Sequence, residues 1–400
     1  MDLIIRINPE LKLLYEQFEN DDGSVIVEVD FALYGCLESG RLWYEYFKEV
    51  LLRMGYIVCP HDDCIFNKFD DESVIISTIV LHVITGSSEE FLDDFLRNLT
   101  DEIGDLSIQR GPIHDYLGMR LEFKEIGVVE ITISAFIKSI LDDWIVEKKR
   151  NTPAKSDLFE VNDKSPVLDT TMRKKLHRGI AQLLYLAIHV RPDILCATIF
   201  LTSRVKDLTE EDLSKFMNVL YYLNETINLG IILGGDKENK IGLYAYGDAS
   251  FGVHTDGKSQ GGTYISYGRG PILARSNKLK DVAISTSESE LMQLSNTTSL
   301  AARELSFAKY QQYMRENEPG ILLEDNMSAI HMANNGKSIS NRTRHIKVKY
   351  FFVKQYLDCG EFKLLHCPTK QMIADILTKP LQGELFYELR DLILGYAIAH

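Results

Sequence analysis

Hydrophobic spacing along the first half of the chain predicts a succession of short strands and amphipathic helices. Within residues 31–56, Leu42, Tyr46, Val50 and Leu51 recur at helical spacing, which predicts a helix with one buried face. The apolar run SVIISTIVLHVITG at 73–86 is too short and too polar to span a bilayer and is typical of buried strand. Residues 89–104 return to helical spacing, with acids on the opposite face. The pattern favours a mixed α/β protein.

Helices are also predicted through the middle of the chain. The stretch AFIKSILDDWIV predicts one helix, and a polar, proline-containing linker near 147–166 follows it and marks the clearest domain boundary. Two further helices are separated at Arg191 and Pro192, because proline disfavours helix in the residue before it. Thr209, with Asp212 three residues later, predicts a capped helix start. We expect this region to contribute packing and no chemistry.

Residues 241–385 place four acidic residues in four separate contexts. Asp248 follows the strand-like stretch IGLYAYG, Glu290 opens a helical run, Asp325 ends the strand ILLED, and Asp375 opens a last amphipathic turn. Glu288 is an alternative to Glu290, but the two lie about 200° apart on a helix, and the ELMQLS register favours Glu290. An order of strand, helix, strand and helix brings one carboxylate from each element to a common point.

Such an oxygen-rich cluster predicts a metal-dependent nuclease. Carboxylates bind hard cations, with Mg²⁺ the usual ion where phosphate completes the shell. Two ions about 4 Å apart activate a water and stabilise the leaving oxygen of a phosphodiester. The expected cofactor is therefore a pair of Mg²⁺ ions, with Mn²⁺ as the alternative.

Composition adds a charge asymmetry to this picture. The chain of 400 residues has a formal net charge of −14, yet residues 241–385 hold 17 basic against 14 acidic residues. Only this part is suited to a polyanionic phosphate backbone. The six cysteines lack paired CxxC spacing, and the first residues lack a signal-peptide layout, so we expect an intracellular protein of the cytoplasm or nucleus, without membrane association.

The same residues resemble the ribonuclease H domain of copia-type LTR retrotransposon Pol polyproteins. The resemblance runs through DASFGVHTDGKSQGG, GPILARSNKL, STSESELMQLS, EDNMSAI, RTRHIKVKYFFVKQ and CPTKQMIADILTKPL, in that order and spacing. Upstream, ALYGCLESGRLWYEYF and HDDCIFNKF resemble the palm region of the family's reverse transcriptases. The protease, the integrase, the fingers and most of the palm have no counterpart here, so we expect a C-terminal fragment of a Pol polyprotein.

The resemblance implies a mixed α+β and α/β fold with four parts. These are a partial reverse-transcriptase palm, a helical connection, a ribonuclease H-like mixed five-stranded sheet flanked by helices, and a short tail. Their expected ranges are 1–125, 126–235, 236–388 and 389–400. The implied catalytic residues are also the metal ligands: Asp248, Glu290, Asp325 and Asp375.

The polymerase hairpin departs from the family pattern. The family has two adjacent aspartates in a strand–turn–strand hairpin, and Ile84 and Thr85 stand at those places in HVITGSS. Isoleucine cannot ligate a metal, and neutral threonine is a poor substitute for a carboxylate. The expected polymerase site is therefore degenerate, and reverse transcriptase activity should be absent.

Basic residues in two clusters are expected to contact the backbone of an RNA–DNA hybrid. The first cluster contains Arg275 and Lys278, and solvated surface charge is the alternative explanation for it. The second cluster contains Arg342, Arg344, Lys347 and Lys349 and directly precedes a predicted helix. Two interpretations of the whole chain follow: an active ribonuclease H attached to an inert polymerase remnant, or a non-catalytic relic or interaction scaffold. The remaining expected partners are the missing polymerase part or a second copy bound through an exposed palm edge. The expected nucleic-acid-binding residues are Arg275, Lys278, Arg342, Arg344, Lys347 and Lys349.

Overall fold

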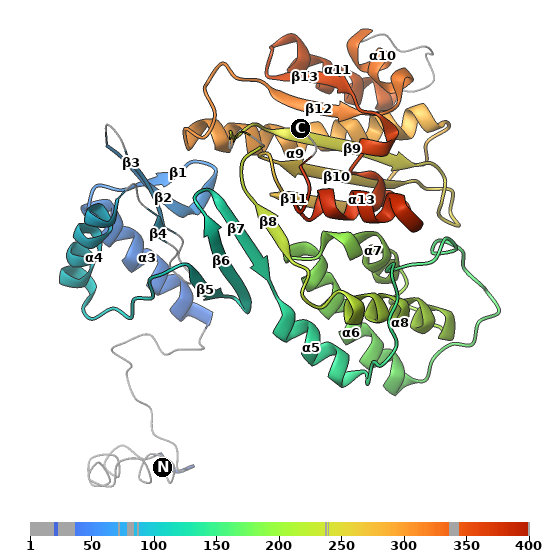
Figure 1. Cartoon of the computed structure of the whole chain (residues 1–400), viewed down its shortest axis with the longest axis horizontal. Coiled ribbons are helices and arrows are strands. Elements are labelled where there is room, and N and C mark those ends of the chain that lie inside the picture. The colour runs from blue at the N-terminus through green and yellow to red at the C-terminus, as the bar shows by residue number, and fades with distance from the viewer. Residues whose placement is uncertain are drawn as a thin grey trace. The chain divides into compact units, whose positions relative to one another are not determined.

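Two separately packed units, residues 1–107 and 108–400, make up the chain in this computed structural model (Figure 1). The structure describes residues 20–22, 37–70, 73–77, 84–85, 88–236, 238, 240–335 and 344–398. None of the helices within these ranges is long and apolar enough to cross a membrane.

The first unit packs two helices against a four-stranded antiparallel sheet of order β1-β2-β3-β4. Phe47, Val50 and Leu51 on α3 are buried with Phe95 on α4, which confirms two amphipathic helices. The predicted apolar face of the first helix is partly wrong, because Leu42 is 58% exposed and the Tyr46 ring also lies toward solvent. The bounds are α3 Leu37–Arg53, β1 Ile57–Cys59, β2 Asp62–Asp70, β3 Ser73–Ser77, β4 Ile84–Thr85 and α4 Glu89–Ile103.

The second unit begins with strands that return to one another in antiparallel order, β5-β6-β7-β8. Four α-helices and one short 3-10 helix lie in the chain between β7 and β8. The bounds are β5 Ile113–Tyr116, β6 Met119–Glu125, β7 Val128–Thr132, α5 Ser134–Asp143, α6 Thr170–His189, η3 Pro192–Ile194, α7 Leu195–Ser203, α8 Glu210–Glu225 and β8 Ile231–Leu233.

The predicted start and break signals of these helices are confirmed. Thr209 and Asp212 form a reciprocal capping box at the start of α8, so two otherwise unpaired amide groups are satisfied. The helix α6 ends before Arg191 and Pro192, and a short 3-10 turn leads into α7. The guanidinium of Arg191, fully buried, donates to both carboxylate oxygens of Asp193 and to Thr226, so the break between the helices is fixed by a satisfied polar network.

A mixed five-stranded sheet of order β11-β10-β9-β12-β13 follows. The strands β9, β10 and β11 are antiparallel, while β12 runs parallel to both β9 and β13. The predicted mixed five-stranded sheet flanked by helices is confirmed. The bounds are β9 Tyr244–Ser250, β10 Gln260–Ser266, β11 Leu273–Lys278, α9 Thr286–Tyr310, β12 Gly320–Glu324, α10 Met327–Asn335, α11 Arg344–Asp358, β13 Phe362–His366, η4 Thr369–Gln371, α12 Asp375–Thr378 and α13 Gly383–Ile393.

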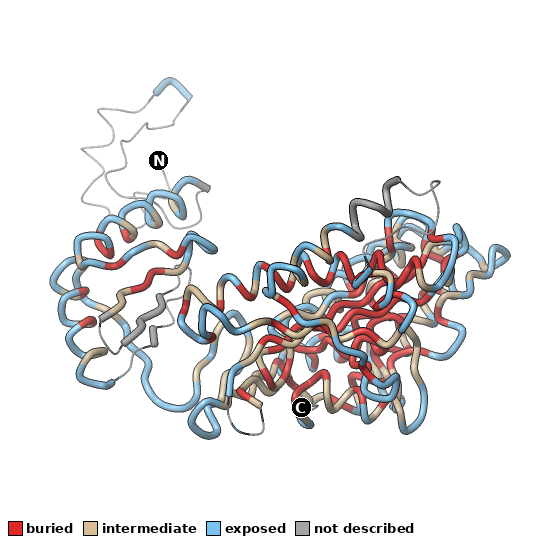
Figure 2. Tube along the Cα trace, turned by 90° about the horizontal axis from the view of Figure 1, so that it is seen from above, coloured by how far each residue is buried: buried red, intermediate tan, exposed pale blue. Residues whose placement is uncertain are grey.

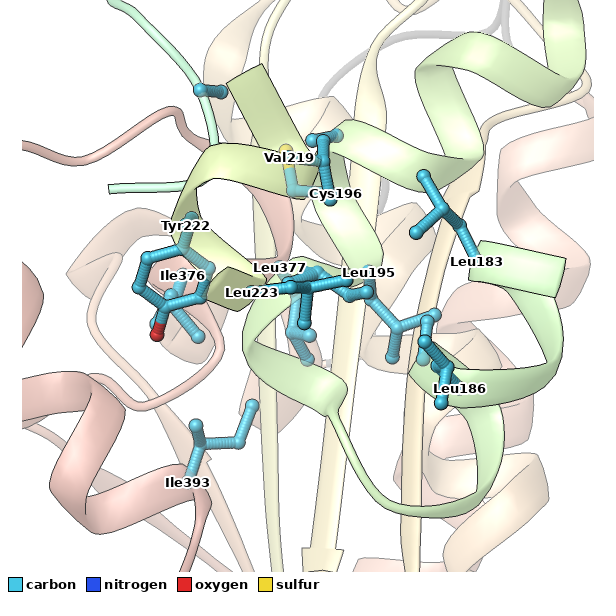
Figure 3. Close-up of a cluster of buried hydrophobic side chains, with 14 of the residues drawn as sticks. Leu183, Leu186, Leu195, Cys196, Val219, Tyr222, Leu223, Ile376, Leu377 and Ile393 are labelled. Atoms are coloured by element: carbon cyan, nitrogen blue, oxygen red, sulfur yellow. The ribbon is translucent and has the colours of Figure 1, made fainter. Parts of the chain in front are cut away.

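Helices cover both faces of this sheet, and nearly every residue of its strands β9 and β10 is buried. Figure 2 shows the buried residues gathered in the interior of this unit. The long helix α9 packs on one face with Leu291 and Leu294, and α10 and α11 lie beside it. The other face contacts α7 and α12. There the side chains of α6, α7 and α8 share one core with Ile376, Leu377 and Ile393 (Figure 3).

The two compact units divide between residues 107 and 108, away from the boundary predicted at the linker near 147–166. That segment lies inside the second unit, where Ala154 and Leu158 are buried in the shared core. The amide of Gln382 donates to the Ala154 carbonyl at 2.8 Å. The segment is therefore irregular in conformation but packed, and the division into four ranges stays a prediction.

Because the helical layer and the sheet share a core, we expect damage to the layer to destabilise the sheet. Leu186→Ala removes a fully buried side chain of α6 and should cost about 2–5 kcal/mol of unfolding free energy. Amide hydrogen exchange in β9 and β10 should accelerate accordingly. Phe95→Ala, in the core of the first unit, is the matched control and should leave those amides unchanged. Unchanged exchange in Leu186→Ala would show that the sheet folds without the layer.

Candidate metal centre

Asp248 lies at the middle of the five-stranded sheet, on β9, and is only 1% exposed. Its Oδ2 accepts a hydrogen bond from the Thr378 hydroxyl, and its Oδ1 lies 3.2 Å from the Lys379 ammonium. Both partners belong to the segment at the end of α12. The last predicted turn of the chain therefore folds back onto the central strand and fixes the Asp248 carboxylate.

Glu290 reaches the same region from α9, which covers the opposite face of the sheet. Its Oε2 accepts a hydrogen bond from the Ala249 amide at 2.8 Å, directly beside Asp248 in the chain. Glu288, the alternative weighed from the sequence, instead accepts from the Ile284 amide and closes the start of its own helix. Glu290 therefore belongs to the carboxylate cluster, whereas Glu288, although also buried, stabilises the start of α9.

Asp325 and Asp375 complete the cluster. Asp325 follows the last residue of β12, and Asp375 is the first residue of α12. One carboxylate oxygen from each of Asp248, Asp325 and Asp375 lies within 4.8 Å of the others. Asp325 belongs to a second group as well, with Glu290 and Glu324, under the same distance limit. The structure therefore brings all four predicted residues together, in two groups that overlap at Asp325.

A pair of glycines on β10 allows the two helices to approach so closely. Gly262 is the register partner of Asp248, and a Cβ there would lie 2.8 Å from Thr378 and 2.9 Å from the Ala374 carbonyl. Gly261 pairs with Ala249, and a Cβ there would collide with the Gln293 side chain of α9. Because successive residues of a strand face opposite sides, one glycine admits α12 and the other admits α9.

Burial and mutual repulsion perturb the acids of this cluster. Burial, followed by the Asp248 and Glu324 carboxylates, raises the pKa of Glu290 to about 11. Burial and the Asp248 carboxylate raise the pKa of Asp375 to about 7, against the opposing effect of Lys379. These carboxyl groups cannot all be ionised together unless a cation lies among them.

Two residues of this centre were not singled out from the sequence. Glu324 is fully buried and belongs to the second carboxylate group. The ammonium of Lys379 lies 2.6 Å from Asp375 and 3.2 Å from Asp248. Although burial lowers it, these two carboxylates raise the pKa of Lys379. Strand alternation in ILLE, where Leu322 is buried, was the signal that could have identified Glu324 as an inward-facing residue.

The expected hybrid-binding residues are described only in part. Arg275 is exposed on β11, and the Lys278 ammonium lies 2.8 Å from Asp256, so part of its charge is neutralised. Arg342 lies outside the described residues. The second basic cluster was predicted to precede a helix, and this is wrong. Its residues Arg344, Lys347 and Lys349 lie within the first turns of α11, and only their backbone is described.

The two positions at which we expected a degenerate polymerase site form the short strand β4. Thr85 pairs with Ile76 and Ile84 with Ser77, so β4 lies antiparallel to β3. The structure describes the backbone of Ile84 and Thr85 and not their side chains. Their neighbours His82 and Val83 lie outside the described residues.

The chemistry of the donor set fits Mg²⁺ or Mn²⁺. All five acids offer hard oxygen ligands, and no softer group is needed to complete either group. Lys379 acts as a cation in contact with two of them, and Glu324 has a buried oxygen, Oε2, without a hydrogen-bond partner. Both observations indicate a position that favours positive charge.

Lys379→Met tests this balance of charge. Without the ammonium, Asp248 and Asp375 repel each other in a buried place, so the melting temperature of the metal-free chain should fall. Added Mg²⁺ should restore it, because a divalent cation replaces the lost charge and binds only the folded state. Differential scanning calorimetry with and without Mg²⁺ measures both effects.

Lys354→Met is the matched control, because Lys354 pairs with Asp358 at the same 2.6 Å and the same i,i+4 spacing, but near the surface. That substitution should change the melting temperature little. A Lys379→Met variant that is as stable as the wild type, or one that Mg²⁺ fails to stabilise, would contradict the proposed charge balance.

Comparison with known proteins identifies relatives along most of the chain. The family described as "Reverse transcriptase (RNA-dependent DNA polymerase)" matches residues 15–154. The retrovirus-related Pol polyprotein from transposon RE1 of Arabidopsis thaliana is 28% identical over 374 residues, 92% of this chain and 25% of the relative. That from transposon TNT 1-94 of Nicotiana tabacum is 23% identical over 385 residues, 92% of this chain and 28% of the relative.

A solved structure, the foamy viral protease-reverse transcriptase in complex with an RNA/DNA hybrid, matches 88% of this chain and 42% of its own, with a TM-score of 0.42 and 13% identity. The chain spans about a quarter of the length of the Arabidopsis relatives. By its sequence, the chain is therefore similar to the reverse transcriptase family over residues 15–154 and to retrotransposon Pol polyproteins along most of its length.

Proposed function

We propose that residues 236–388 are a metal-dependent ribonuclease H that cleaves the RNA strand of RNA–DNA hybrids. The observation that supports this most is the meeting of Asp248, Glu290, Asp325 and Asp375 in two carboxylate groups that share Asp325, the second of which also contains Glu324. One shared aspartate between two groups is the arrangement that two neighbouring ions require.

The residues of the centre have distinct roles in this proposal. When bound, the ions activate a water and stabilise the leaving oxygen of the phosphodiester. Asp248 and Asp325 hold the ions from the sheet, while Glu290 and Asp375 close the site from the helices. The Thr378 hydroxyl and the Ala249 amide hold Asp248 and Glu290 in place, so little movement is needed when ions bind.

Similarity to the reverse transcriptase family supports an RNA–DNA hybrid as the substrate. An RNA-dependent DNA polymerase, which is the description of the family matched at 15–154, produces such a hybrid as its product. Hybrids are recognised by shape and by the 2′-hydroxyl, so no base-reading motif is required. The net positive charge of residues 241–385 suits the backbone, with contacts from Arg275, Lys278, Arg342, Arg344, Lys347 and Lys349.

The remaining parts of the proposal are non-catalytic. Residues 1–125 are a reverse-transcriptase-like part whose polymerase site has lost its carboxylates at Ile84 and Thr85. Residues 126–235, a helical connection, support the sheet, and 389–400 are a tail. The edge of the first unit's sheet is offered as the surface for the missing polymerase part or for a second copy.

Hybrid cleavage by the full chain is the direct test of this function. The wild type should cut the RNA strand with Mg²⁺ and stop when EDTA removes the ion. Asp325→Asn keeps the shape of the side chain but removes a charge shared by both ion positions, so the cleavage rate should fall by orders of magnitude. Glu290→Gln should behave likewise.

Glu288→Gln is the matched control, because this equally buried residue of the same helix caps a turn and lies in neither carboxylate group. It should cleave at close to the wild-type rate. A wild type that does not cut, or an Asp325→Asn variant that cuts as well, would leave the relic or scaffold interpretation in place.

Primer extension on an RNA template tests the degenerate polymerase. The wild type should not extend a primer with Mg²⁺ or Mn²⁺, because Ile84 and Thr85 offer no carboxylate to the metals. The double change Ile84→Asp and Thr85→Asp should not restore synthesis, since the family's third aspartate has no counterpart in this chain. Extension by the wild type would refute the claim, and extension by the double variant alone would show that a third carboxylate is supplied, with Asp30 as the candidate.

A further inference from the structure

Glu324 is a buried acid of the second carboxylate group that has no role in the proposed ribonuclease H. It is the last residue of β12 and is fully buried. Its Oε1 accepts the amide of Asn326 at 3.1 Å, whereas its Oε2 is buried without a hydrogen-bond partner. A carboxylate oxygen in this state is unfavourable unless something outside the chain satisfies it.

Strand geometry explains the direction of this side chain. Leu322, two residues earlier, is buried in the core under α9. Because every second residue of a strand faces the same side, Glu324 also faces α9, which carries Glu290. One oxygen from each of Glu290, Glu324 and Asp325 lies within 4.8 Å of the others.

No ion pair among the described residues neutralises this group directly. The carboxylates of Asp248 and Asp325 add negative charge beside Glu324, and Lys379 acts on Glu290 and Asp325 without forming an ion pair with either. The ammonium of Lys379 pairs with Asp248 and Asp375, which belong to the other carboxylate group. Among the described residues, the second group therefore lacks an ion pair of the kind that Lys379 supplies to the first.

We propose that Glu324 is a fifth protein ligand, which builds the second ion's position together with Glu290 and Asp325. This inference depends on the proposed function, because it assigns a ligand to one of the two ions of that same centre. Three carboxylates give this position more negative charge than a two-acid site would have, and the free Oε2 is available to the ion. Asp325 is then the shared ligand between a position at Asp248 and Asp375 and a position at Glu290 and Glu324.

Ion counting on the full chain tests the assignment. Mn²⁺ is titrated and the free ion is measured by its electron paramagnetic resonance signal, without nucleic acid. The wild type should bind two ions. Glu324→Gln keeps the size of the side chain and an acceptor for the Asn326 amide. It should lower the affinity for the second ion by about tenfold or more and leave the affinity for the first ion unchanged. Glu288→Gln should bind both ions as the wild type does.

Each outcome decides between the alternatives. Two ions of unchanged affinity in Glu324→Gln would overturn the inference and indicate a hydrogen bond between Glu324 and Glu290 in place of a metal ligand. No bound ion in the wild type would refute the proposed function itself. If Glu324→Gln does not fold, which circular dichroism detects, Glu324→Thr suits a strand and must lose the second ion in the same way.

Discussion

Negative charge held out of water is the constraint on which the second unit depends. Asp248, Glu290 and Asp375 are each less than 5% exposed, so any of them that is ionised loses its hydration and repels a neighbouring carboxylate more strongly than in water. The Ala249 amide, the Thr378 hydroxyl and the Lys379 ammonium offset this repulsion from three sides. Ala249 lies on β9 and donates to Glu290 of α9, whereas Thr378 and Lys379 are adjacent residues at the end of α12. The cluster therefore exists only when the sheet, α9 and α12 are all in place.

The helical layer between β7 and β8 supports this arrangement from the face of the sheet opposite to α9. Its core is continuous with Ile376 and Leu377, which lie within α12, and with Tyr246 on β9. The buried Arg191 guanidinium fixes the bend between α6 and α7 through four hydrogen bonds to Asp193 and Thr226. The position of α12, and so of Asp375, is therefore set by residues far from the acids in sequence.

Local signals in the sequence predicted much of this structure. The capping pair Thr209 and Asp212 and the break at Pro192 depend on neighbours within four residues, so they could be seen directly. The four acids could be identified because each one lies in or beside a regular element that the sequence predicts: Asp248 in β9, Glu290 in the first turns of α9, Asp325 directly after β12 and Asp375 at the start of α12. Glu324 was missed because an acid at the end of a strand usually faces solvent, and its burial depends on α9 packing over the strand.

Tertiary packing also decided the remaining differences. Lys379 was not singled out, because its contact with Asp248 joins residues 131 positions apart. Leu42 fits a helical apolar face by spacing, yet the first unit buries the neighbouring face with Phe47, Val50 and Leu51. The segment 147–166 is polar and proline-containing, which is typical of a linker, but its few apolar side chains reach the shared core. In each case a distant contact overrides the local pattern.

The glycine pair on β10 affects how loss of this site by mutation should be judged. Gly261 and Gly262 contribute no functional group, and a comparison of catalytic residues alone would pass over both. A single methyl group at Gly262 would nevertheless push α12 away from Asp248, because Thr378 and the Ala374 carbonyl leave no room for it. A copy of this sequence could therefore keep every acid and still lose the spacing between them. Whether this site is intact therefore depends on its smallest residues as much as on its charged ones.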